Sequence, residues 1–341
     1  MATDTTTGDI EQVVREYRAA LLREELRHME EMAEAWARMS KGLTKDIEEL
    51  SAEVAELAKA GEKVPIGKVH KLDSYKRTLA QVEEQSLAFA DYTNIKVGSL
   101  QEAYGTLGLA EGGSVVDLAY LNATGDTLAF STLSDLEAVE ALRAGFAADG
   151  SPLRELMLRE YPDMFEKIED VLESGLLRGL SPKEIAKRLS AVTEIPLGNA
   201  LRIARTETLR AYREATRATY EDSGVVTEYK RMATKDTRTC MACIALDGKI
   251  YPVERQMGDH PNGRCSMVPI VGGLEPEWQS GVDWFKEQDE ATQKEMLGPE
   301  VYDSWKDESF EIEDLATVSQ SKEWGEQVQR TPLKDLEKKE E

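Results

Sequence analysis

The stretch CMACIALDGKIYPVERQMGDHPNGRC, residues 240–265, decides the fold of one part of this chain because it holds all three cysteines. His260, one of three histidines, lies among them in the pattern Cys240-x2-Cys243-x16-His260-x4-Cys265. Two cysteines separated by two residues can direct both sulfurs at one point, and a returning segment can close a tetrahedron around Zn²⁺. We therefore predict a structural Zn²⁺ bound by these three cysteines and His260.

Other interpretations of the cysteines stay open. They could be buried free thiols or a dithiol redox pair. A thioredoxin-type pair needs a βαβ context and a helix that starts at the pair, and neither is evident in the sequence. If one of the four residues does not bind the metal, Asp236, Asp247 or Asp259 could take its place. A catalytic zinc would instead need an open coordination position.

The residues around the cysteines predict a small β module over residues 225–273. Val225–Met232 alternates with a period of two, as strands do. The Asp-Gly pair within Leu246–Lys249 is a hairpin turn signal, and apolar residues follow it. We expect a zinc-stapled β-hairpin module, in which metal binding supplies folding free energy rather than turnover.

Helical periodicity dominates the N-terminal third. Apolar residues from Ile10 to Leu57 recur at helical spacing and predict two successive helices, and a third is expected after a glycine- and proline-containing break. Together these helices form the expected helical arm or bundle of residues 1–105. Five glycines between residues 105 and 125 predict a linker over residues 106–128.

A central helical domain is predicted over residues 129–224. Ser151 followed by a proline indicates a helix start, and Ser181 with Glu184 has capping-box spacing. Residues 274–341 are expected to form an acidic helical tail that carries about half of the excess negative charge. The fold class that follows is mainly α with a small β module.

The expected helix after residue 195 carries five arginines whose directions fall within about 140° of one another. One basic face is therefore predicted on an acidic protein, and it could contact DNA phosphates or an acidic partner. The alternative is pairing with the chain's own carboxylates. The five residues are Arg202, Arg205, Arg210, Arg213 and Arg217.

The composition excludes some function classes. A formal net charge of −23 argues against a protein that binds nucleic acid over its whole surface. No apolar run of about 18 residues occurs, so no membrane span is expected. The polar start of the chain has no hydrophobic signal core, which favours a reducing compartment and thiols or metal ligands over disulfides.

Several of these residues occur in one known family. Ala204–Thr208 reads ARTET, Asp236–Cys243 reads DTRTCMAC, and His260–Cys265 reads HPNGRC. In this order the segments resemble the phage Mu protein F-like minor head proteins, which contain the phage head morphogenesis domain. The resemblance extends over residues 130–335 and includes the WFKEQ stretch at Trp284–Gln288.

The resemblance implies a structural minor head protein of a tailed bacteriophage, and no enzyme. Its implied partners are the portal protein and the capsid or scaffold subunits, with phage DNA as a further candidate, in an oligomeric assembly. The implied location is the virion, in the head interior or near the portal, and the host cytoplasm during assembly. Arg205, Thr206, Glu207 and Asp236 match the family signature. We expect them to have a structural role, in which Arg205 and Glu207 hold their helix against the zinc module.

One position departs from the family pattern. Many members have a cysteine where this chain has Gly263, so Cys265 would have to replace that cysteine if it is a metal ligand. Two rival functions are also considered. A zinc-dependent hydrolase or nuclease needs an open zinc position beside a carboxylate such as Glu207 or Asp236. A virion-carried effector needs a C-terminal catalytic domain of the toxin or ADP-ribosyltransferase kind that some members carry, and we expect none after Gly273.

Overall fold

The computed structural model describes residues 9–58, 65–128, 195–321 and 325–336, with scattered positions between 155 and 192. The predicted helix starts at Ser151 and Ser181 lie outside the described residues. The chain divides into two compact units. The first contains residues 1–24, 98–150 and 206–341, and the second contains residues 25–97 and 151–205.

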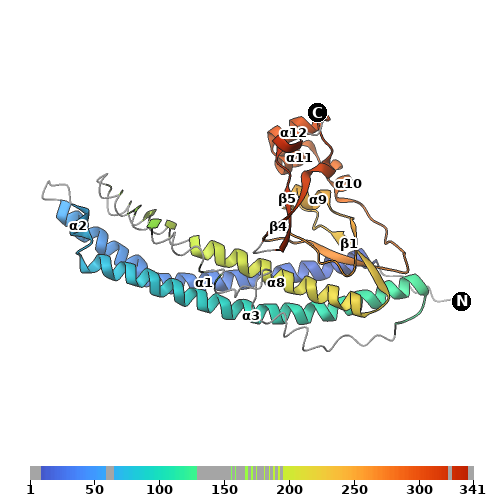
Figure 1. Ribbon diagram of the computed structural model, residues 1–341, viewed down its shortest axis with the longest axis horizontal. Helices are drawn as coiled ribbons and strands as arrows, with labels where there is room; N and C mark the ends of the chain where they lie inside the picture. The colour runs from blue at the N-terminus through green and yellow to red at the C-terminus, as the bar shows by residue number, and fades with distance from the viewer. Residues whose placement is uncertain are drawn as a thin grey trace. The chain divides into compact units, whose positions relative to one another are not determined.

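The described elements are long helices followed by a region of short strands and short helices (Figure 1). The helices of the first part are α1 (Ile10–Ala58), α2 (Ile66–Val69), α3 (Asp73–Thr124) and α8 (Ile195–Asp222). The β module has β1 (Val226–Met232), α9 (Met241–Ala245), β2 (Ile250–Pro252) and β3 (Ser266–Val271). The tail has α10 (Gly281–Lys286), α11 (Glu290–Leu297), α12 (Pro299–Lys306), η1 (Ile312–Leu315), β4 (Ala316–Ser321), β5 (Gly325–Arg330) and α13 (Leu333–Leu336).

Helix α1 is one continuous helix where the periodicity predicted two. Its buried apolar residues continue along its length, from Val14 and Leu21 to Leu50 and Val54. Gly42 lies between them, but a glycine inside a helix costs only about 1 kcal/mol relative to alanine. That cost is too small to end a helix with a continuous apolar stripe.

The predicted linker over residues 106–128 is wrong, because α3 continues to Thr124. The glycines in this part of α3 allow close packing against α8. A Cβ atom at Gly108 would lie 2.5 Å from the carbonyl oxygen of Tyr212. Gly125, with a φ of 78°, ends the helix. Glycine on a helix surface therefore marks a close helix contact here, although the sequence pattern suggested a break.

The core of the first unit surrounds a three-stranded antiparallel sheet with the order β2-β1-β3. One buried cluster contains residues from the start of α1, the end of α3, the last turn of α8 and the sheet. Cys243 and Cys265 belong to this cluster. Its other members include Ile10, Val14, Val115, Val116, Tyr220, Tyr229, Met267, Val268 and Val271.

The predicted strand at residues 225–232 is confirmed as β1, but the hairpin predicted around Asp247 is wrong. The segment before this turn is helix α9, so the Asp-Gly turn joins a helix to β2. Gly248 has a φ of 82°, and its N–H donates to the carbonyl oxygen of Arg231 at 2.8 Å. The central strand β1 therefore pairs with both β2 and β3.

The tail contains the expected helices and also a hairpin, β4–β5, that the sequence did not predict. Val328 of β5 is buried against Ala242 of α9 and against Leu246, which follows this helix. Its cross-strand partner Val318 is 47% exposed. Most other residues of the two strands are polar, which hides the period-two pattern. The tail helices form a second core with Met241 and Ile244 of α9.

The second unit is helical in its described residues. Trp36, Phe89 and Ala200 form a small buried cluster there, and the two rings meet edge to face at a centroid distance of 4.8 Å. Lys96 pairs with Glu31 at 2.7 Å. In the described parts of the chain, no helix has both the length and the apolar character to span a membrane.

Two glycines of α3 provide a matched test of the helix contact. Gly108→Ala places a methyl group against the backbone of α8, and overpacking of this kind costs about 1–3 kcal/mol of unfolding free energy. Gly98→Ala faces open space, so its higher helix propensity should add up to about 1 kcal/mol. Urea unfolding of both variants measures the difference. Equal effects would contradict the close approach of α3 and α8.

Candidate metal centre

Helix α9 positions the first two cysteines. Cys240 is its N-cap residue, and the Sγ atom of Cys240 accepts a hydrogen bond from the N–H of Cys243 at 3.4 Å. This bond satisfies one of the unpaired N–H groups at the helix start and brings the two side chains to one end of α9. A helix therefore does start at the cysteine pair, which was not evident in the sequence.

His260 approaches the same point from the loop before β3. Its Nε2 atom lies 3.2 Å from Sγ of Cys240, and its Nδ1 atom lies 2.8 Å from the carbonyl oxygen of Pro261. A carbonyl can only accept, so the Nδ1 atom carries the proton in this contact. Nε2 then faces the sulfur, which is the orientation in which a deprotonated Nε2 could bind a metal.

The possible ligand atoms form two trios that share Cys243. Those of Cys240, Cys243 and His260 lie within 4.8 Å of one another, and so do those of Cys243, Asp259 and Cys265. All four predicted ligands therefore lie in one cluster, and Asp259 adds a fifth donor. We call these five residues the thiol cluster. Cys243, Asp259 and Cys265 are buried, and Cys240 and His260 are partly exposed.

Asp259 occupies the space beside Gly263. A Cβ atom at Gly263 would lie 2.1 Å from the carboxyl group of Asp259, so a cysteine does not fit there with Asp259 in this place. The Oδ2 atom of Asp259 is buried without a hydrogen-bond partner among the described residues. Cys265, two positions after Gly263, reaches the cluster instead.

Two buried arginines, which the sequence analysis did not assign to the cluster, surround Asp259. Arg231 donates to Oδ1 of Asp259 at 3.2 Å, to Sγ of Cys243 at 3.6 Å and to the carbonyl oxygen of Gly258. Arg213 pairs with Oδ2 of Asp259 at 3.4 Å and donates to the carbonyl oxygen of Gly263 at 3.3 Å. The side chain of Arg231 is 1% exposed, so its charge acts where water screens little.

These surroundings shift the proton affinities of the cluster. The hydrogen bond with Cys243 and the charge of Asp259 raise the pKa of His260 to about 9, against desolvation. The hydrogen bonds between Cys240 and Cys243 lower the pKa of Cys240. A hydrogen bond with Cys243 and complete burial raise the pKa of Cys265 well above its usual value.

Neighbouring elements fix the loop that carries His260 and Cys265. The hydroxyl of Thr206 in α8 accepts from the N–H of Asn262 at 3.0 Å. Arg18 in α1 donates to the carbonyl oxygen of Arg264 at 2.6 Å. Asp236 accepts two hydrogen bonds from Arg264, both 2.6 Å long. Although burial opposes ionisation, this guanidinium lowers the pKa of Asp236 to about 2.

The other two signature residues of α8, Arg205 and Glu207, each form an ion pair. Arg205 pairs with Glu25 of α1 at 2.5 Å within the second unit. Glu207 is fully buried and pairs with Arg210, one turn along α8. Thr206 and Arg213 bind the loop between residues 259 and 265.

The five arginines of the predicted basic face all contact polar groups of the chain itself. Arg202 donates to Asn199 at 3.3 Å, and Arg217 pairs with Glu214 and Glu221 at 3.1 and 2.7 Å. Arg205, Arg210 and Arg213 pair with carboxylates as described above. The alternative of internal pairing therefore accounts for the contacts of this face.

Comparison with known proteins matches the same region. Residues 166–268 match the family model described as Phage Mu protein F like protein. This part of the chain is similar to the Mu protein F-like family. The match includes Cys240, Cys243, His260 and Cys265, and it supports a role in phage head morphogenesis.

One curated relative is an NAD(+)–arginine ADP-ribosyltransferase, EFV, from Enterococcus faecalis. It is 27% identical over 175 residues, which cover 46% of this chain and 34% of the relative. The chain therefore spans about a third of the length of the curated relative it matches. No solved structure matches the chain.

The pair formed by Asp236 and Arg264 can be tested through pH. The pKa of Asp236 is about 2 in the folded state and 3.8 in an ordinary carboxyl, so its contribution is complete above about pH 4 and is lost as the pH falls towards 2. Because its side chain is 32% exposed, we expect Asp236→Asn to lower the unfolding free energy at pH 7 by only about 1 kcal/mol. The difference in unfolding free energy between Asp236→Asn and the unchanged protein should become smaller below pH 4.

Urea titrations of both proteins at pH 7, 5, 4 and 3 measure this difference in unfolding free energy. Asp303→Asn is the matched control, because that carboxylate is 69% exposed on α12 and should have little effect. A constant gap at all four pH values would show that Asp236 acts through its shape and not through its charge.

Proposed function

We propose that this protein is a structural component of a tailed-phage head, in which a Zn²⁺ ion holds the β module together. The observation that carries the proposal is the presence of two donor trios that share Cys243, inside a segment that matches the Mu protein F-like family. One trio adds Cys240 and His260, and the other adds Asp259 and Cys265. Cys240, Cys243, His260 and Cys265 would bind the ion, and the ion would supply folding free energy.

The donor set fits zinc on chemical grounds. Thiolate sulfur and neutral imidazole nitrogen are the ligands of structural zinc sites. The Nδ1 contact of His260 with a backbone carbonyl is the kind of support that fixes a metal-binding imidazole. A site with four such protein ligands leaves no position for a substrate.

Buried charge gives a second argument. With neutral thiols, the buried groups Arg18, Arg213 and Arg231 all interact with the carboxylate of Asp259, so three positive charges share this one negative charge. Uncompensated buried charge is costly. A divalent ion bound by three thiolates adds one net negative charge, so metal binding would reduce this positive surplus.

The hydrolase alternative has less support. A general base near neutral pH needs a pKa close to the working pH. Asp236 has a pKa of about 2 because Arg264 binds it, and Glu207 is paired with Arg210. Neither carboxylate has the surroundings of a base that activates a zinc-bound water.

The proposed partners are the portal protein and the capsid or scaffold subunits, in an oligomeric assembly of the virion near the portal. Assembly would take place in the host cytoplasm. The ADP-ribosyltransferase activity in the name of the curated relative belongs to a protein of which the chain spans 34%. We propose that the two proteins share a head-protein segment and not that activity.

The metal site makes a direct prediction. Protein purified under reducing conditions without chelators should contain about one zinc per chain by elemental analysis. His260→Gln and Cys240→Ser should lose most of the metal, and their melting temperatures should fall by roughly 5 °C or more, since 1 kcal/mol corresponds to about 2–4 °C for a domain of 150–250 residues. His70→Gln is the matched control, since this exposed histidine stacks on Tyr75 in the second unit.

If the unchanged protein contains no metal and both cluster variants keep its melting temperature, the zinc proposal is wrong. The family match would remain, because it does not depend on the metal.

DNA contact through the arginine face stays a prediction with its own test. If the face neutralised about three phosphates, the affinity for DNA would fall roughly 40-fold between 50 and 200 mM salt. Arg202→Gln would then reduce the slope of log affinity against log salt concentration by the amount expected for about one phosphate contact. Arg77→Gln, on the exposed surface of α3, is the matched control. A dissociation constant that does not change with salt would exclude phosphate contact.

A further inference from the structure

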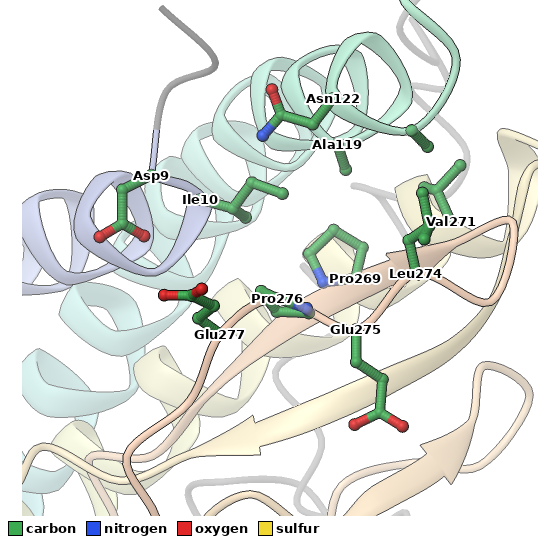
Figure 2. A pocket seen from close by; sticks show the side chains of 11 residues that line it. Asp9, Ile10, Ala119, Asn122, Pro269, Val271, Leu274, Glu275, Pro276 and Glu277 are labelled. Carbon is green, nitrogen blue, oxygen red and sulfur yellow. The ribbon is translucent and has the colours of Figure 1, made fainter.

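A groove of about 450 Å³ lies beside β3 in the first unit (Figure 2). Its walls come from three separate parts of the chain: the start of α1 at Asp9 and Ile10, the end of α3 at Ala119 and Asn122, and the segment from Pro269 to Glu277. A volume of this size accommodates several side chains. None of the thiol-cluster residues lines it.

The floor of the groove is apolar. Ile10, Ala119 and Val271 are buried members of the main core, and each presents part of its surface to the groove. Leu274 stands at the rim and is 57% exposed. Exposed apolar surface with a polar rim is typical of a site that binds another protein.

The rim of the groove is acidic. Asp9, Glu275 and Glu277 are among the eleven described lining residues, and none of the eleven is basic. Lys230 pairs with Glu275 at 2.8 Å. Asp9 and Glu277 form no ion pair with a described residue, and Figure 2 shows their carboxylates at the same end of the groove.

We propose that this groove is the docking site for a segment of another protein that inserts an apolar side chain and places a lysine or arginine against Asp9 and Glu277. The apolar floor would bind the inserted side chain, and the two carboxylates would give the segment its direction. A second copy of this chain is a poor occupant, because its net charge of −23 would bring like charges together. The inference stands whether or not the thiol cluster binds zinc.

The test begins with an unbiased probe. A displayed library of random twelve-residue peptides is selected on the full-length protein and counter-selected on the Ala123→Phe variant, whose larger side chain fills part of the groove. Enriched peptides should combine a large apolar residue with a neighbouring lysine or arginine. No enrichment over the filled variant, or enrichment of acidic peptides, would overturn the proposal.

The best peptide is then labelled and titrated by fluorescence anisotropy. Glu277→Lys should weaken its binding at least tenfold, because a cation replaces the carboxylate that faces the peptide's own cation. Since Glu277 is exposed, this variant should fold even if Ala123→Phe does not. The matched control is Glu295→Lys, which makes the same charge change on the exposed face of α11. Equal weakening by both glutamate variants would show general charge attraction and would also overturn the proposal.

Discussion

The carboxylate of Asp259 lies between the guanidinium groups of Arg213 and Arg231, and the arrangement of the thiol cluster depends on this contact. Arg213 belongs to α8 and Arg231 to β1, so one buried carboxylate joins the long helix to the central strand. Removing one partner of such a group leaves an uncompensated buried charge. The loop that follows Asp259 brings His260 and Cys265 to the cysteines of α9, so its position decides whether the four possible ligands meet.

This constraint draws its contacts from distant parts of the chain. Thr206 and Arg213 of α8, Arg18 of α1 and Asp236 after β1 each bind the backbone or side chains of residues 262–264. These groups can be required for the folded structure without taking part in a reaction. They hold a loop without regular secondary structure, whose polar backbone groups would otherwise be buried without partners.

The sequence predicted the parts of the site that local spacing encodes. Cys240 and Cys243 are close together at the start of α9, and His260 and Cys265 lie close together just before β3. The spacing of each pair along the chain therefore predicted that its members are neighbours. Asp259 was one of three aspartates that the sequence offered as a replacement ligand, but nothing in the spacing singled it out from Asp236 and Asp247. Arg231 joins the cluster only through the pairing of β1, and no local pattern marks it. The same limit applies to the fold. Gly108 predicted a helix break, because the sequence does not show that Tyr212 of α8 lies beside it. The polar segments of β4 and β5 show no strand pattern, and they form strands because Val328 is buried against α9.

The groove and the thiol cluster are two surfaces of the same core. Ile10 and Val271 form part of the groove floor, and Cys243 and Cys265 belong to the same buried cluster of residues. Strand β3 connects them directly, since it begins next to Cys265 and ends at Val271. Folding free energy from a bound ion at one end of β3 would therefore also hold the groove at the other end. A protein whose task is to bind its neighbours in an assembly would gain from such a link, because a rigid docking surface loses less conformational entropy when the partner binds.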